Sequence, residues 1–144
     1  MKNNVLIVHP YFRSLGGAEY LCLTLTETLI DSGYSVLLYT THPPDLTRVK
    51  SFYNINLKYK LIKILKTNEF NIPAPMLLKK MINYNRIIKS ILYHDSFKEY
   101  IVIDTQLNIP WAPHITYIHY PYLIEAILKG IYNNESLYKQ IYYR

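Results

Sequence analysis

The stretch "VLIVHPYFRSLGGAEYLCLTL", Val5 to Leu25, decides the fold class of this chain. It starts with a short continuous apolar run, the pattern of a strand that is covered on both faces in a parallel sheet. A polar loop with a glycine pair, Gly16 and Gly17, follows. From Ala18 onward apolar residues recur at helical spacing, and "DSG", Asp31 to Gly33, places a glycine past the helix end. This stretch therefore predicts a strand, a loop and a helix of about four turns.

A second buried strand, "YSVLLYT", Tyr34 to Thr40, follows this helix and completes a right-handed βαβ unit. After the "HPP" break at His42 to Pro44, "DLTRVKSFYN" is interpreted as a polar crossover. The segment "INLKYKLIKI", Ile55 to Ile64, alternates apolar and polar residues. It predicts a third, more exposed strand.

The second half of the chain predicts a long helix and two further strands. A rigid turn, "NIPAP", Asn71 to Pro75, opens the helical pattern. A fourth strand is predicted at "YIVID", Tyr100 to Asp104, and a fifth at "HITYIHY", His114 to Tyr120. Beyond Pro121 the chain is predicted to be helical to its last residue. The apolar stripe of the long helix comprises Leu77, Met81, Tyr84, Ile88, Ile91 and Leu92.

The alternation of strands and helices predicts an α/β fold, with residues 1–144 forming one Rossmann-like domain around a doubly wound parallel sheet. Ligand sites of such sheets lie at the carboxyl ends of the strands. This rule points to the loops after Val8 and Asp104 and to the end of the fifth strand. No cap or helix breaker follows Ile141, so we expect that the chain stops inside a helix.

The composition is that of a globular protein, with 50% hydrophobic and 18% charged residues. The single cysteine, Cys22, excludes an intramolecular disulfide and favours a reducing compartment. It lies on the apolar stripe of the first helix, so we expect a core residue rather than a nucleophile. The sequence has neither a signal-peptide pattern nor a run of about 18 apolar residues, which predicts a cytoplasmic protein that is at most peripheral to a membrane.

The net charge of +6 is concentrated in one basic segment, residues 58–89, in which Glu69 is the single acidic residue. A solvated surface is the simplest interpretation of this segment. It could also attract phosphates or anionic lipid head groups. The sequence contains no nucleic-acid recognition module, so we do not expect a nucleic-acid partner.

The glycine loop is the first candidate site. Free backbone N–H groups at the start of a helix form an anion site, and glycine lets a ligand approach the main chain. Neither the dinucleotide pattern G-x-G-x-x-G nor a Walker G-K-[ST] is present. Gly16 and Gly17 are therefore candidate substrate-binding residues, and Arg13 and Glu19 are further candidates in the same loop. The structural alternative is a tight turn in which Glu19 only favours the helix dipole.

Two histidines are predicted at the same edge of the sheet. His119 lies at the end of the fifth strand, where an imidazole suits hydrogen bonding or proton transfer near neutral pH. His9 ends the first strand, so the two rings could flank one cleft. A third ligand at suitable spacing is not evident, so no metal site is expected. Asp104 is either a carboxylate of the site or part of a turn in "DTQ".

Four segments in order, "VLIVHPYFRSLGGAE", "GYSVLLYT", "YIVIDTQ" and "HITYIHYPY", resemble the N-terminal domain of family 4 glycosyltransferases of the GT-B fold. The first and last are similar to the branch of mannosyltransferases that extend dolichol-linked oligosaccharides. The resemblance covers roughly residues 4 to 125. It implies that residues 1–144 form the acceptor-side N-terminal half of such an enzyme.

The resemblance also implies a function for the candidate residues. The family transfers a sugar from a nucleotide-sugar with retention of configuration and without a metal. Gly16 and Gly17 match the loop whose amides approach the donor diphosphate and the acceptor. His119 matches the histidine near the transferred sugar and is the predicted catalytic residue.

The C-terminal half of the family, which binds the nucleotide-sugar, has no counterpart in these residues. We therefore expect negligible transfer by this polypeptide alone. It would be either a truncated chain or a subunit that works with a C-terminal half on a second polypeptide. The basic segment would place the domain near a lipid-linked acceptor at an anionic membrane. The alternative hypothesis is a non-enzymatic Rossmann-like partner or binding protein.

Overall fold

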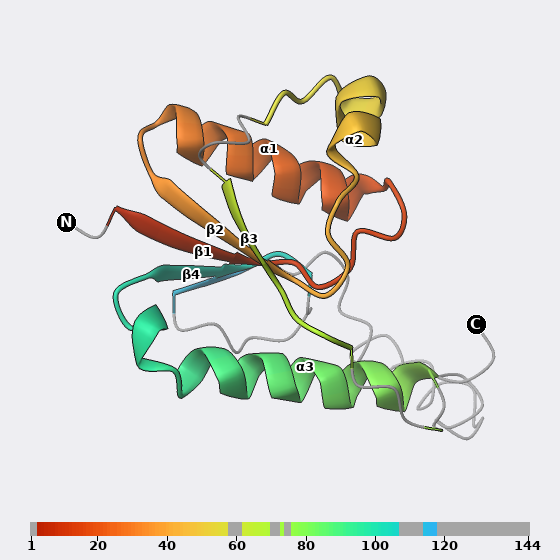
Figure 1. The fold of residues 1–144 in the computed structure, drawn as a ribbon, viewed down its shortest axis with the longest axis vertical. Coiled ribbons are helices and arrows are strands. Elements are labelled where there is room, and N and C mark those ends of the chain that lie inside the picture. Colours follow the sequence, from red (N-terminus) through yellow and green to blue (C-terminus); the bar gives the residue numbers. More distant parts are fainter. Residues whose placement is uncertain (1–2, 58–61, 70–72, 74–75, 107–113, 118–144) are drawn as a thin grey trace, which may run out of the picture.

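The computed structural model describes residues 3–57, 62–69, 73, 76–106 and 114–117. Its centre is a parallel sheet of five strands in the order β3-β2-β1-β4-β5 (Figure 1). The strands are β1 (Asn4–Val8), β2 (Ser35–Thr40), β3 (Ile62–Lys66), β4 (Ile101–Asp104) and β5 (Ile115–Thr116). This architecture confirms the predicted Rossmann-like, doubly wound α/β fold.

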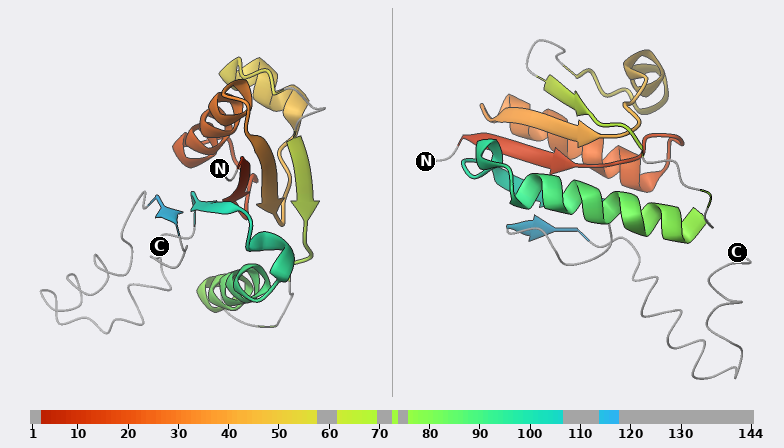
Figure 2. Two further views of the ribbon diagram at one scale, coloured as in Figure 1. Left: turned by 90° about the vertical axis from the view of Figure 1, so that its left-hand side faces the viewer. Right: turned by 60° about the horizontal axis from the view of Figure 1, so that its bottom comes forward.

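Helices cover both faces of the sheet. They are α1 (Gly17–Asp31), α2 (Leu46–Tyr53) and α3 (Met76–Leu92), and a short 3₁₀ helix, η1 (Asp95–Phe97), precedes β4. Figure 2 shows α1 and α2 on one face and α3 on the other. This arrangement explains why β1, β2 and β4 contain consecutive buried apolar residues, because each face of the sheet packs against a helix.

The two faces of β1 belong to two different core clusters. Val5 and Ile7 pack with residues of α1 and α2, whereas Leu6 and Val8 pack with residues of α3. All four side chains are at most 1% exposed. Successive side chains of a strand point to opposite faces, so a strand at the centre of a two-sided sheet must be apolar throughout. The run that opens the sequence is therefore the innermost element of the fold.

The helix α1 begins and ends close to its predicted bounds. Its end is fixed by Gly33, whose φ of 87° lies in the left-handed region that glycine adopts without strain. Cys22 is completely buried between α1 and the sheet, which confirms its predicted place in the core. Burial raises the pKa of its thiol to about 12.

The polar crossover "DLTRVKSFYN" contains a helix that the sequence pattern did not predict, because residues 46–53 form α2. Asp45 caps this helix by accepting hydrogen bonds from the N–H groups of Thr47 and Arg48 at 3.0 and 3.2 Å. Val49 is fully buried and attaches the helix to the core. The chain leaves α2 through Asn54, which adopts a left-handed conformation with φ of 57°. One buried residue in a short helix gives too little periodicity to be seen in the sequence.

The third strand lies later in the sequence than predicted. The strand β3 spans Ile62–Lys66, and Ile55 and Leu57, predicted to belong to it, precede it as buried residues of the connecting segment. Their burial produced the alternating pattern without a strand, because a segment that crosses the end of the core can also bury every second side chain.

The apolar stripe of α3 also differs in part. Ile87 and Ile91 are buried against the sheet, with Tyr84 and Ile88 packed beside them, whereas Leu92 is 45% exposed. The inclusion of Leu92 was therefore wrong, and Ile87 takes its place. The predicted parts of the fifth strand beyond Tyr117, the helical region after Pro121 and most of the turn at Asn71 to Pro75 lie outside the described residues. Among the helices that the structure describes, none is long and apolar enough to cross a membrane.

The cap of α2 gives a first prediction. Asp45→Ala removes the acceptor for two helix N–H groups and should lower the free energy of unfolding by about 1 kcal/mol. Asp45→Asn keeps an acceptor oxygen and serves as the matched control. Urea titrations followed by circular dichroism measure both variants, and equal stability of Asp45→Ala and the wild type would contradict the capping function.

The buried thiol gives a second prediction. At pH 8 a group with a pKa of about 12 is almost entirely protonated, and Cys22 is also inaccessible to solvent. An aromatic disulfide reagent should therefore modify the native protein at least about 100-fold more slowly than the urea-unfolded chain. Equal rates for the two states would show that α1 does not cover the thiol in solution.

Candidate functional site

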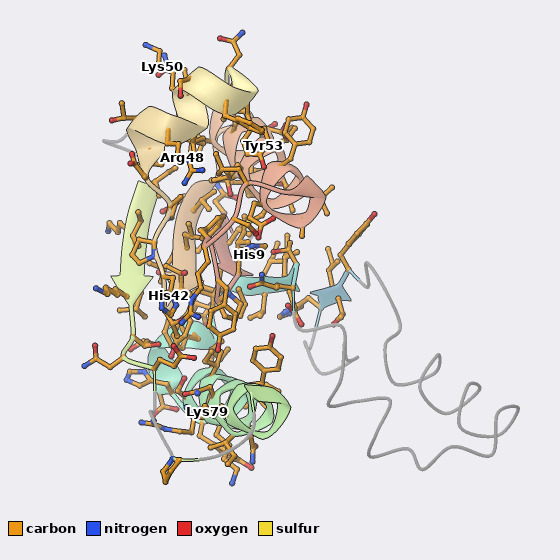
Figure 3. The ribbon with its side chains drawn as sticks, turned by 90° about the vertical axis from the view of Figure 1, so that its right-hand side faces the viewer. His9, His42, Arg48, Lys50, Tyr53 and Lys79 are labelled. Carbon is orange, nitrogen blue, oxygen red and sulfur yellow. The ribbon has the colours of Figure 1, made fainter. Side chains whose placement is uncertain are left out.

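The predicted site lies at the edge of the sheet where the strands end. Figure 3 views this edge with the carboxyl ends of the strands toward the reader, and His9 and His42 lie near its centre. The loops after β1, β2, β3 and β4 meet here, so residues far apart in sequence become neighbours. The loop after β1 carries most of the predicted site residues and lies between the other loops.

The start of this loop is held as a continuation of β1. Tyr11 forms an isolated parallel bridge with His42, and the N–H of Phe12 donates to the carbonyl of His42 at 3.1 Å. The carbonyl of Pro10 accepts from the N–H groups of Thr41 and His42, both at 3.0 Å. These bonds fix one side of the loop to the end of β2.

Gln106 fixes the other side of the loop to the end of β4. Its side-chain oxygen accepts from the N–H of Tyr11 at 2.6 Å, and its side-chain nitrogen donates to the carbonyl of Tyr11 at 3.0 Å. A carboxamide carries both a donor and an acceptor, so one side chain satisfies both backbone groups. Asp104 in turn accepts from the N–H of Gln106 at 2.9 Å, so this carboxylate forms the turn of "DTQ".

His9 lies at the predicted edge but is fully buried. Its Nδ1 lies 2.9 Å from the hydroxyl of Thr105, and its ring lies 4.3 Å from that of Phe12. These contacts join the ends of β1 and β4 beneath the loop. His9 therefore lies beneath the site, where it helps to hold the ends of β1 and β4 together, and not on the accessible surface of the site.

The two glycines of the loop have different surroundings. Gly16 precedes α1, and its N–H donates to a carboxylate oxygen of Glu19 at 3.0 Å, while its carbonyl accepts from the hydroxyl of Tyr53 at 2.7 Å. Glu19 is 7% exposed, so its negative charge is fixed at the helix N-terminus, where the dipole stabilises it. By contrast, a Cβ placed on Gly17 would meet nothing within 4 Å. Gly17 is thus the open position of the pair.

Arg13 belongs to a cluster of polar and charged side chains from three loops. One of its terminal nitrogens, Nη2, donates to the Glu69 carboxylate at 2.8 Å and lies 2.9 Å from Nε2 of His42. The guanidinium also lies 5.5 Å from the centre of the Tyr11 ring. The sequence did not indicate His42 or Glu69, because each lies in a different loop and only the sheet order brings them to Arg13.

Two tyrosines lie beneath this cluster. The Tyr11 hydroxyl donates to Glu69 at 3.3 Å, and its ring lies 6.1 Å from that of Tyr84. Burial and the Glu69 carboxylate raise the pKa of Tyr11 well above its usual range. Burial, followed by the charges of Asp104 and Glu69, raises the pKa of Tyr84 to about 12. Both phenols therefore stay protonated near neutral pH, and that of Tyr11 donates to Glu69.

The predicted catalytic residue, His119, lies outside the described residues, so its position relative to the glycine loop stays a prediction. The other candidates lie at one edge but not at one point. Arg13 and Gly17 are accessible to solvent, whereas His9 and Glu19 are buried beneath the surface of this edge. Among the described residues, no group of three or more histidine, cysteine, aspartate or glutamate side chains could hold a metal ion.

Comparison with protein families, with curated proteins and with solved structures finds no match to this chain.

The clamp formed by Gln106 gives a third prediction. Gln106→Ala leaves the N–H and the carbonyl of Tyr11 without this partner, so the free energy of unfolding should fall by about 1–3 kcal/mol. Asn68→Ala removes an exposed amide from the loop after β3 and is the control, with an expected change below about 0.5 kcal/mol. Denaturant unfolding measures both, and similar small changes for the two variants would contradict the clamp.

Proposed function

We propose that this chain forms the acceptor-side, N-terminal half of a retaining, metal-independent glycosyltransferase of family 4. The proposal is supported by the position of Gly17. This residue has open space above it at the start of α1, directly after β1, at the edge where Rossmann-like sheets bind ligands. The resemblance seen in the sequence supplies the reaction, which the fold alone would not.

The charge at the glycine loop bears on which part of a substrate it would bind. Glu19 already places a carboxylate against the N–H of Gly16, so a diphosphate there would face a fixed like charge. A neutral sugar hydroxyl meets no such repulsion. Gly17 is therefore better suited to an acceptor hydroxyl than to the donor diphosphate that the resemblance also assigned to this loop.

The remaining parts of the proposal concern partners. A C-terminal half on a second polypeptide would supply the nucleotide-sugar site, and His119 would act near the transferred sugar. Exposed cations on β3 and α3 would favour an anionic membrane that holds a lipid-linked acceptor. Those described as exposed are Lys63, Lys66, Arg86 and Lys89.

One observation favours a second candidate, a non-enzymatic partner protein. The carboxylate of Glu19 satisfies the Gly16 N–H without a ligand, as a purely structural turn would require. Under this alternative neither nucleotide-sugars nor polyprenyl phosphates should raise the melting temperature of the chain.

A transfer assay tests the proposal and gives a fourth prediction. The chain is co-expressed with a family 4 C-terminal domain, and transfer of labelled sugar to a polyprenyl phosphate is measured. Gly17→Val should reduce transfer about 100-fold, because its side chain would occupy the space at Gly17, where an added Cβ meets no atom within 4 Å. His119→Ala should lower the rate to a similar extent.

Thr28→Val is the control, since it places valine at an exposed position of α1 far from the loop. Circular dichroism verifies that each variant folds. Full activity of His119→Ala would reject the function of that residue. No transfer by the wild-type pair, together with no ligand-induced rise in melting temperature, would reject the glycosyltransferase proposal in favour of the partner protein.

A further inference from the structure

The side chains of Arg13, His42 and Glu69 contact one another, and the glycosyltransferase proposal assigns this cluster no function. Nη2 of Arg13 contacts both the Glu69 carboxylate at 2.8 Å and Nε2 of His42 at 2.9 Å. The same oxygen of Glu69 lies 3.7 Å from Nε2 of His42. The three side chains are partly open to solvent, with Arg13 60% exposed, His42 33% and Glu69 29%.

The hydrogen bonds around His42 determine where its proton lies. A guanidinium only donates, so Nε2 must accept from Arg13 and carries no proton. On the other side of the ring, Nδ1 lies 3.0 Å from the Thr41 hydroxyl, which donates its own proton to the carbonyl of Pro10 at 2.7 Å. Nδ1 therefore carries the proton and donates to Thr41. His42 is neutral in this arrangement.

Protonation of His42 is incompatible with its contact to Arg13. A proton on Nε2 would point a donor at a donor and place two positive charges side by side. Glu69 would then be the nearest acceptor for Nε2–H. The Glu69 carboxylate can therefore pair with either of two cations. It pairs with Arg13 while His42 is neutral, and it pairs with His42 when the ring is charged and the guanidinium has moved away.

The surroundings of His42 agree with this coupling. Burial and the charges of Arg13 and Lys66 lower its pKa, and Glu69 opposes them. These are the charged groups that face the ring from the loop after β1 and from β3 with its following loop, and the Tyr11 ring lies 5.4 Å away. Removal of Arg13 from the ring would leave Glu69 as its closest charge and would raise the pKa of His42.

We propose that Arg13, His42 and Glu69 form a proton-coupled anion site, in which a phosphate-bearing ligand takes Arg13 from Glu69 while His42 takes up a proton and pairs with Glu69. The phosphate of the ligand replaces the Glu69 carboxylate at the guanidinium of Arg13, and the proton that His42 takes up comes from solvent. Arg13 keeps an anionic partner throughout, and Glu69 keeps a cationic one. The site therefore binds anions more tightly as the pH falls through the titration of His42.

The test uses inorganic sulfate, which mimics phosphate and keeps one protonation state near neutral pH. Nuclear magnetic resonance of the imidazole Cε1–H measures the pKa of His42 with and without sulfate, against sodium chloride at equal ionic strength. The wild type should show a rise of about one unit at saturation, and the sulfate affinity should be about tenfold higher well below this pKa than well above it.

Three variants separate the parts of the site. Arg13→Gln should abolish the sulfate effect and raise the pKa of His42 even without ligand. Glu69→Gln should bind sulfate more tightly, because the competing carboxylate is gone, with a smaller pKa response. Arg48→Gln removes an exposed arginine on α2 and should behave like the wild type.

A sulfate-independent titration of His42, or equal sulfate binding by Arg13→Gln and Arg48→Gln, would overturn the proposal. Glycerol phosphate and vesicles of phosphatidic acid in phosphatidylcholine distinguish a soluble phosphate from a lipid head group, and the site is supported by whichever shifts the His42 titration. The site does not depend on the glycosyltransferase proposal, since failure of sugar transfer leaves the sulfate response unchanged.

Discussion

The burial of β1 on both faces is the constraint on which the rest of the structure depends. Its four central side chains are apolar and at most 1% exposed, so the strand requires a helix layer on each side and a paired strand at each edge. By the coefficient for buried apolar surface, each such side chain contributes about 1.5–3 kcal/mol. The neighbours β2 and β4 are placed by this requirement, and their loops then hold the segment that continues from β1.

The loop after β1 combines a fixed start with an open end. Its first residues are bonded on one side to Thr41 and His42 and on the other to Gln106. The accessible groups, Arg13 and Gly17, follow this fixed part. Such an arrangement would lower the entropy lost on binding of a ligand at this loop, because the backbone before these two residues is already ordered.

The sequence predicted those strands and helices whose apolar residues form a pattern within the element itself. The buried run before His9 and the periodicity from Ala18 identified β1 and α1, since each pattern arises from one strand or one helix. The helix α2 escaped prediction because it buries only Val49, and β3 was placed too early because Ile55 and Leu57 are buried without belonging to a strand.

The site was predicted less completely for a different physical reason. In the sequence, His42 lies 29 residues and Glu69 lies 56 residues after Arg13. Each of the three is an ordinary polar residue of a loop. Their meeting follows from the strand order, in which β2 lies between β1 and β3 and the loops after these three strands leave the same edge. Strand order is a property of the assembled sheet, so no local pattern could have indicated this cluster. The burial of Glu19 also depends on how the loop packs.

The pairing of β1 with β4 has a consequence for how the protein folds. β1, α1 and β2 contact one another over short stretches of chain, whereas His9 and Thr105 are 96 residues apart. Contacts that close long segments cost more chain entropy and form slowly. The βαβ unit should therefore assemble early, and the glycine loop acquires its second anchor only when β4 docks. A ribosome would have to release most of the described chain before this edge of the sheet takes its final shape.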